Sequence, residues 1–98
     1  MRFLFNDKKL KALYTDKKGA QKYGRAVVES FFEVMAAIEA APDTQDLRKL
    51  KGLRFEKLKG SRKGQHSMRL TDQWRLVFEI GTEGGREFLR ILEIADYH

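Results

Sequence analysis

Cations are concentrated in one stretch of the chain, and they are the first residues that could do chemistry. Between Arg48 and Arg75 there are ten Lys or Arg residues and two acids, Glu56 and Asp72, so this window carries +8 while the rest of the chain sums to −2. The net charge of +6 is therefore local. Basic side chains gathered with a lone Trp and short alternating apolar runs indicate a folded surface that binds a polyanion, and nucleic acid fits best.

Several side chains are suited to phosphate chemistry. The guanidinium of Arg75, on the polar face of an expected strand, could hold phosphate oxygens in a bidentate manner, and Lys59 could add a point charge. The imidazole of His98 ordinarily titrates near neutrality, which suits proton transfer. On residue type alone, the same cations could instead contact backbone phosphates without catalysis, and a final residue is ordinarily frayed.

The composition is that of one small globular domain, covering residues 1–98. Hydrophobic residues make up 42% of the chain, which is more than disordered proteins contain. There is no cysteine, and the two histidines show no metal-ligand spacing with the scattered carboxylates, so we expect no disulfide, metal or other cofactor. The N-terminal segment has only three apolar residues in a row, so we expect no membrane association and a cytoplasmic protein.

Apolar periodicity predicts one strand and two helices in the N-terminal half. A β-prone run at Arg2–Phe5 precedes a helix whose narrow apolar stripe contains Leu10, Leu13 and Tyr14. A second helix, over Ala20–Ala40, has a broad apolar face. Two helices joined this closely should form an antiparallel hairpin that covers one face of a sheet.

Alternation predicts four strands in the second half of the chain. They are Leu53–Leu58, Gln65–Leu70, Trp74–Ile80 and Phe88–Ala95. Trp74 alternates with Leu76 and Phe78, so we expect its ring in the core and not on a base-stacking surface. The order βααββββ predicts an α+β fold in which a helical hairpin packs on a small, mainly antiparallel sheet.

Short motifs occur in a set order in the second half. They are Leu58–Gly60 (LKG), Arg62–Gly64 (RKG) with Ser67 after it, Gln73–Arg75 (QWR) with Phe78 after it, and the terminal Asp96–His98 (DYH). No single triplet is specific, but the ordered set resembles the HigB-type toxins of the RelE/ParE superfamily of bacterial toxin–antitoxin systems. The resemblance is firm over the last half of the chain, and the N-terminal helices match in type and order.

The resemblance implies a compact microbial-ribonuclease-like fold. It also implies a metal-independent endoribonuclease that cuts messenger RNA in the ribosomal decoding site and so inhibits translation. The expected partners are the ribosome with bound mRNA and a helix-turn-helix antitoxin of the HigA type. The free toxin would be monomeric, and its complex with the antitoxin would be oligomeric.

Matched to the family motifs, the resemblance assigns catalysis to Lys59, Arg75, Asp96 and His98. Metal-free RNA hydrolysis must activate the 2′-hydroxyl, stabilise the phosphorane and protonate the leaving 5′-oxygen. Arg75 and Lys59 would stabilise the negative charge, and His98 would move a proton while Asp96 orients its ring. Tyr97 would stack on a base if the chain curls at its end, and is otherwise an aromatic at the core edge.

Glu56 departs from the family pattern. Many members have a histidine two residues before Leu-Lys-Gly, where this chain has Glu56. A carboxylate could act as the base, although its ordinary pKa is about two units below that of imidazole, or Glu56 could balance Arg54 and Lys57. His66 shares its face with apolar residues and is expected to be a packed histidine.

Other cations are expected to bind RNA electrostatically and not to catalyse. They are Arg54, Lys57, Arg62, Lys63 and Arg69. Two other functions fit the same residues. One is a non-enzymatic inhibitor that binds DNA gyrase, as in another branch of the superfamily, which would not need His98. The other is a basic RNA-binding module without catalysis.

Overall fold

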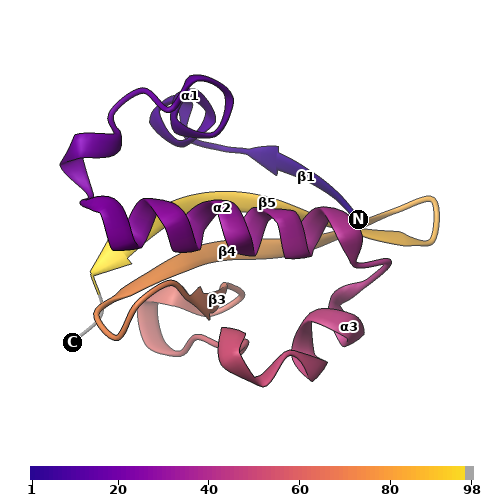
Figure 1. Ribbon diagram of the computed structural model, residues 1–98. Coiled ribbons are helices and arrows are strands. Elements are labelled where there is room, and N and C mark those ends of the chain that lie inside the picture. The colour runs from indigo at the N-terminus through magenta and orange to yellow at the C-terminus, as the bar shows by residue number, and fades with distance from the viewer. Residues whose placement is uncertain (97–98) are drawn as a thin grey trace.

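A mixed five-stranded sheet with its helices on one face forms the frame of the protein (Figure 1). The computed structural model describes residues 1–96. The sheet order is β1-β5-β4-β3-β2, in which β1 is parallel to β5 and the other neighbours are antiparallel. The elements are β1 (Arg2–Phe5), α1 (Lys8–Asp16), the 3₁₀ turn η1 (Ala20–Lys22), α2 (Arg25–Ala40), α3 (Thr44–Lys49), η2 (Lys51–Leu53), β2 (Glu56–Lys57), η3 (Gly60–Arg62), β3 (His66–Arg69), β4 (Trp74–Glu83) and β5 (Arg86–Asp96).

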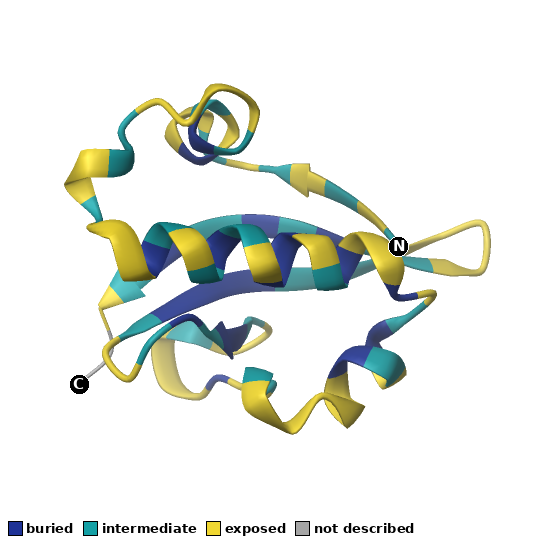
Figure 2. Cartoon of the chain, in the orientation of Figure 1, coloured by how far each residue is buried: buried dark blue, intermediate teal, exposed yellow. Residues whose placement is uncertain are grey.

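One hydrophobic core joins the helices to the sheet. Helix α2 crosses the sheet and turns its buried stripe toward it, while its outer side is exposed (Figure 2). The large apolar side chains with the least exposure are Leu10, Leu13, Phe31, Met35, Ile38, Leu47, Met68, Leu76, Phe78, Leu89 and Ile91. Burial of each such side chain contributes about 1.5–3 kcal/mol, so the helices are held by many contacts and not by one. Within residues 1–96, no helix has both the length and the apolar character to cross a membrane.

Side chains of β4 point alternately to the two faces of the sheet. Leu76 and Phe78 lie in the core beneath the helices, and Arg75 and Val77, which alternate with them, point to the opposite face. Trp74 is half-buried and packs against the core, which confirms the predicted core position of its ring. The one strand therefore fixes the position of Arg75 relative to the hydrophobic core.

A β-bulge changes the phase of β5. Val77 pairs with Glu93 but Phe78 pairs with Ile91, so Leu92 is an extra residue on β5. Because of this extra residue, Ile91 and Ile94 both contribute to the core although they are three positions apart. The bulge also sets the end of the strand, where Ala95 pairs with Arg75 and Asp96 with Trp74.

The predicted α+β fold, with a helical hairpin on a mainly antiparallel sheet, is confirmed, but three segments differ in detail. The expected strand Leu53–Leu58 is wrong, because only Glu56–Lys57 pairs and Leu53 ends a 3₁₀ turn. Arg54 is left-handed there, with φ 45°, which interrupts an extended chain. The second helix begins at Arg25 and not at Ala20, because Gly24 has φ 85°, which no helical residue adopts.

Helix α3 was not expected from the sequence. It begins after Asp43, whose side chain accepts a hydrogen bond from the backbone N–H of Asp46 at 3.2 Å. Glu87 of β5 accepts bonds from the backbone N–H and hydroxyl of Thr44 at 2.8 and 2.9 Å. A carboxylate from a neighbouring strand thus satisfies a donor at the start of a helix of only six residues.

We expect Gly81→Ala to destabilise the fold. A Cβ at this position would lie 2.3 Å from the ring of Phe88, and Arg2 and Arg90 hold that ring in cation–π contacts at 5.0 and 5.8 Å. Displacing the ring should lower the free energy of unfolding by about 1–3 kcal/mol, measured by urea titration. In a Phe88→Leu background, Gly81→Ala should lower the free energy of unfolding by less. Additive effects of the two substitutions would contradict this explanation.

Candidate active site

A buried guanidinium is the centre of the candidate site. Arg75 is only 6% exposed, and a charge removed from water in this way needs compensating partners. Its Nε donates to the hydroxyl of Ser67 at 2.7 Å, and its Nη2 donates to the backbone carbonyl of Arg54 at 2.5 Å. The carboxylate of Glu56 lies 3.8 Å from the same Nη2. These contacts fix the plane of the guanidinium before any ligand arrives.

Phe55 positions the segment that contacts Arg75. Its ring packs against His66 and Phe78 at centroid distances of 5.6 and 5.3 Å, and the guanidinium of Arg48 covers it at 4.5 Å. Arg54, immediately before this ring, has the left-handed conformation that costs a residue other than glycine about 1–3 kcal/mol. Anchoring of Phe55 therefore holds the carbonyl of Arg54 against the guanidinium despite the strain.

Glu56 has a partner that was not predicted from the sequence. The expected balance was with Arg54 and Lys57, but the ion pair that is present joins Glu56 to Arg75. Glu56 starts β2 and is exposed, while Arg75 is buried, so the pair lies at the boundary between the protein and solvent. Glu56 is therefore one of the predicted catalytic residues that the fold brings together with Arg75.

Lys59 lies in a loop that is closed by backbone bonds. The N–H of Leu58 donates to the carbonyl of Gln65 at 2.9 Å, and the N–H of Gln65 donates to that of Arg62 at 2.9 Å. Arg62 also forms an ion pair with Glu93 of β5 at 3.1 Å. Lys59 itself is exposed, just before η3. The loop is thus tied to the sheet while its lysine remains accessible to solvent.

Asp96 lies on the other face of the sheet from Arg75. It pairs with Trp74, the neighbour of Arg75, and its carboxylate accepts a hydrogen bond from the side-chain amide of Gln73 at 3.1 Å. The predicted residues Tyr97 and His98 are outside the described part of the chain. The described structure thus brings Arg75 together with Glu56, and places Asp96 beside them on the adjacent strand but on the helical side.

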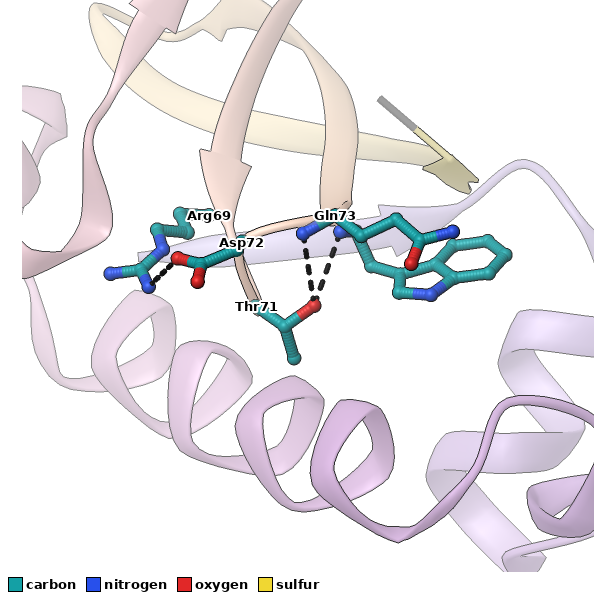
Figure 3. A network of polar contacts seen from close by, with 5 residues as sticks. Arg69, Thr71, Asp72 and Gln73 are labelled. Carbon is teal, nitrogen blue, oxygen red and sulfur yellow. Dashed lines mark hydrogen bonds and ion pairs between the residues drawn. The ribbon is translucent and has the colours of Figure 1, made fainter. Parts of the chain in front are cut away.

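The turn between β3 and β4 sets the start of the Arg75 strand (Figure 3). The hydroxyl of Thr71 accepts hydrogen bonds from the backbone N–H groups of Gln73 and Trp74 at 3.4 and 3.2 Å. Arg69 lies directly across from Arg75, and like charges in this position repel. An ion pair with Asp72 compensates the charge of Arg69.

The predicted RNA-binding cations surround this site with different exposure. Arg54, Lys57 and Lys63 are exposed, whereas Arg62 and Arg69 are half-buried. Both half-buried arginines form ion pairs, with Glu93 and Asp72 respectively. Part of the positive charge counted in the sequence is thus compensated within the protein. Their role in RNA binding stays a prediction.

Besides the Glu56–Arg75 pair, two contacts of Arg75 were not predicted from the sequence. Ser67 was noted only as part of a motif, yet its buried hydroxyl accepts from the Nε of Arg75. The carbonyl of Arg54 has no signal in the sequence, because every residue carries one. The alternation of β3 did contain a signal for Ser67, since Ser67 pairs with Val77 and so lies on the same face as Arg75. Among residues 1–96, no group of three His, Asp or Glu side chains is arranged to hold a metal ion.

His66 is a packed histidine, as its apolar neighbours predicted. Its ring stacks on Phe78 at 5.8 Å, and its buried Nδ1 has no hydrogen-bond partner among the residues described. Burial lowers the pKa of His66 below its usual value, and the positive charges of Arg48 and Lys57 lower it further. Burial and the two cations thus favour the neutral form of the ring.

Several solved structures share the fold of this chain. A mutant of YafQ from E. coli matches 98% of this chain and 93% of its own at a TM-score of 0.64 and 18% identity. The YoeB/ParE toxin from Agrobacterium tumefaciens matches 100% of both chains at a TM-score of 0.59 and 16% identity. The YoeB–YefM complex from Staphylococcus aureus matches 100% of this chain and 97% of its own at a TM-score of 0.55 and 19% identity. The fold is that of the RelE, YafQ and YoeB type.

Sequence comparison then identifies the family. The family model described as the RelE-like toxin of the type II toxin–antitoxin system HigB matches residues 3–98. Toxin HigB-1 of Vibrio cholerae serotype O1 is 36% identical over 75 residues, which are 76% of this chain and 79% of the relative. The chain therefore belongs to the HigB-like toxins of the RelE/ParE type II toxin–antitoxin superfamily. This confirms the resemblance seen in the motifs.

We expect the stability of the protein to decrease at acidic pH because of His66. Its lowered pKa means that the unfolded chain takes up a proton more readily than the folded one. This contribution is therefore complete above the ordinary value of about 6.5 and is lost as the pH falls through the folded pKa. The free energy of unfolding would be measured by urea titration at about pH 7.5 and about pH 5.5. It should change less between these two pH values in His66→Gln than in the native protein or in His98→Gln. If the change with pH were equal in all three proteins, the loss of stability at acidic pH would come from groups other than His66.

Proposed function

We propose that this toxin is a ribosome-dependent endoribonuclease that cleaves mRNA in the ribosomal A site and so inhibits translation. Membership of the HigB-like family supports this function, and the observation that carries it is the pre-oriented guanidinium of Arg75. A planar fork of N–H donors suits the oxygens of a phosphate on which negative charge develops. Ser67 and the Arg54 carbonyl orient that fork, so little reorganisation is needed during the reaction.

Each step of RNA hydrolysis has a proposed group. Glu56 takes the proton of the 2′-hydroxyl, which then attacks the phosphorus. Arg75 stabilises the phosphorane, with Lys59 as a second cation, and the bond to the 5′-oxygen breaks as His98 donates a proton to it. Asp96 is proposed to orient His98, and Tyr97 to stack on a base.

The proposed partners are the ribosome with bound mRNA and a cognate helix-turn-helix antitoxin. A structural neighbour of this chain was solved as a YoeB–YefM complex, which supports an antitoxin partner. We propose that the antitoxin acts partly by covering the basic face or by holding the toxin off the ribosome. The +8 charge of residues 48–75 motivates this, because the same cations would meet ribosomal RNA. A cytoplasmic location is proposed with the ribosome as target.

We expect Arg75→Ala to abolish most mRNA cleavage in a purified translation system. Loss of one pre-oriented donor to a developing anion should slow cleavage by about 10²–10³-fold. Primer extension with and without ribosomes would map the cuts, and His98→Ala should also lose them. Arg86→Ala, an exposed cation at the far end of the β4–β5 hairpin, is the matched control. Intact message with translation blocked would indicate a binding inhibitor, and normal translation would lead to assays of DNA gyrase and of plain RNA binding.

Substitutions of Glu56 should separate a base from a balancing charge. As a base, Glu56→Gln should cleave at least about 10²-fold more slowly. Glu56→His should retain cleavage, with the rising limb of its pH–rate profile about two units higher, because imidazole holds a proton at higher pH than a carboxylate. Native rates in Glu56→Gln would show instead that Glu56 only balances the charge of Arg75.

A further inference from the structure

The loop between β2 and β3 receives little support from the strands on either side of it. Strand β2 consists of Glu56–Lys57, pairs only with β3 and lies at the edge of the sheet. Residues 58–65 leave this edge and return to β3, and they include Lys59 of the proposed mechanism and the 3₁₀ turn η3. Contacts outside β2 and β3 are therefore needed to fix where the loop lies.

One row of paired residues leads across the sheet from β2 to β5. Ser67 of β3 pairs with Glu56 of β2 on one side and with Val77 of β4 on the other. Val77 in turn pairs with Glu93 of β5. Directly paired residues share a face of the sheet, so Glu93 lies on the face opposite to the helices. Arg62 of the loop forms an ion pair with Glu93 at 3.1 Å, and it therefore reaches from the loop past β3 and β4 to β5.

The burial of two apolar side chains agrees with this path of the loop. Val77 is 2% exposed and Leu58 is 8% exposed, although neither belongs to the core cluster between the helices and the sheet. On the face without helices, an apolar side chain is shielded from water only where another part of the chain covers it. The loop begins at Leu58 and is joined to β5 through Arg62, so it passes over Val77 and provides that cover.

Arg62 connects the sheet to the backbone of Lys59. One nitrogen of its guanidinium, Nη1, donates to the side-chain oxygen of Gln65 at 3.0 Å and also contacts the carboxylate of Glu93. The backbone N–H of Arg62 donates to the carbonyl of Lys59 at 3.4 Å, within the turn η3. A contact that fixes Arg62 on β5 thus also fixes the start of η3, where the side chain of Lys59 leaves the backbone.

We propose that Arg62 and Glu93 form a latch that positions Lys59 for cleavage, so that Arg62 is a positioning residue and not an anchor for RNA. The inference rests on the proposed function, because it takes Lys59 as the second cation that stabilises the phosphorane. An ion pair between half-exposed side chains contributes little to the stability of a whole domain, so its loss should displace the loop without unfolding the protein. A displaced cation stabilises the developing charge less well.

The two possible roles of Arg62 predict opposite effects for Glu93→Gln. This change releases Arg62 and raises the net charge by one, so an RNA anchor would bind the ribosome more tightly. Loss of a latch should instead lower the single-turnover rate of mRNA cleavage at saturating ribosome concentration by about 10- to 10²-fold. Glu79→Gln is the matched control, because Glu79 is 39% exposed and pairs with Arg90 at 3.4 Å, while Glu93 is 44% exposed.

A Lys59→Ala background separates positioning from a general structural role. Glu93→Gln or Arg62→Gln should slow cleavage little further in this background, because the group that the latch positions is already absent. Full effects of both changes in the Lys59→Ala background would overturn the proposal. So would a native or faster rate in Glu93→Gln alone. Circular dichroism and urea unfolding of each variant would verify that the fold is retained.

Amide hydrogen exchange tests the latch without any cleavage. The hydrogen-bonded amides of Leu58 and Gln65, which close the loop, should exchange faster in Glu93→Gln than in the native protein or in Glu79→Gln. Unchanged exchange would overturn the latch. The nuclease can fail separately, because intact message with the native protein and faster exchange in Glu93→Gln would keep the latch. That result would remove the proposed function and, with it, the catalytic role of Lys59.

Discussion

Burial of the charge on Arg75 is the constraint on which the rest of this site depends. A guanidinium taken out of water is tolerated only if hydrogen bonds and opposite charge compensate it. The segment that contains the Arg54 carbonyl and Glu56 provides part of that compensation, and Ser67 on β3 provides the rest. The left-handed Arg54 and the two-residue strand β2 are understandable as parts of this arrangement, because a regular strand would carry the carbonyl elsewhere.

The two faces of the sheet have different roles, and β4 connects them. On the helical side, Phe78 is a central core residue and also a support for the rings of Phe55 and His66. On the other side, Arg75 receives its contacts from the segment that Phe55 anchors. A packing contact in the core thus determines the geometry of a polar site on the opposite face. Stability and chemistry are coupled through a few aromatic rings.

Regular elements could be predicted from the sequence, and irregular ones could not. The period of two in β4 correctly predicted that Trp74 points inward and Arg75 outward. The ordered motifs in the second half of the chain correctly indicated the family. Helix α3 is too short to show a helical period, and the left-handed Arg54 lacks the glycine that usually marks such a position. The Glu56–Arg75 pair depends on that irregular segment, so its prediction required the structure. The catalytic roles stay proposals.

The extra residue in β5 makes this strand sensitive to changes in length. Counting from the bulge at Leu92, each later residue has a fixed face, with Ala95 beside Arg75 and Asp96 beside Trp74. An insertion or deletion of one residue after the bulge would exchange these faces, even if every side chain kept its chemical type. By contrast, the exposed Gly84–Gly85 turn can change length without shifting any pair within the sheet. Evolution of this chain is therefore restricted in residue number at one end of the hairpin and much less at the other.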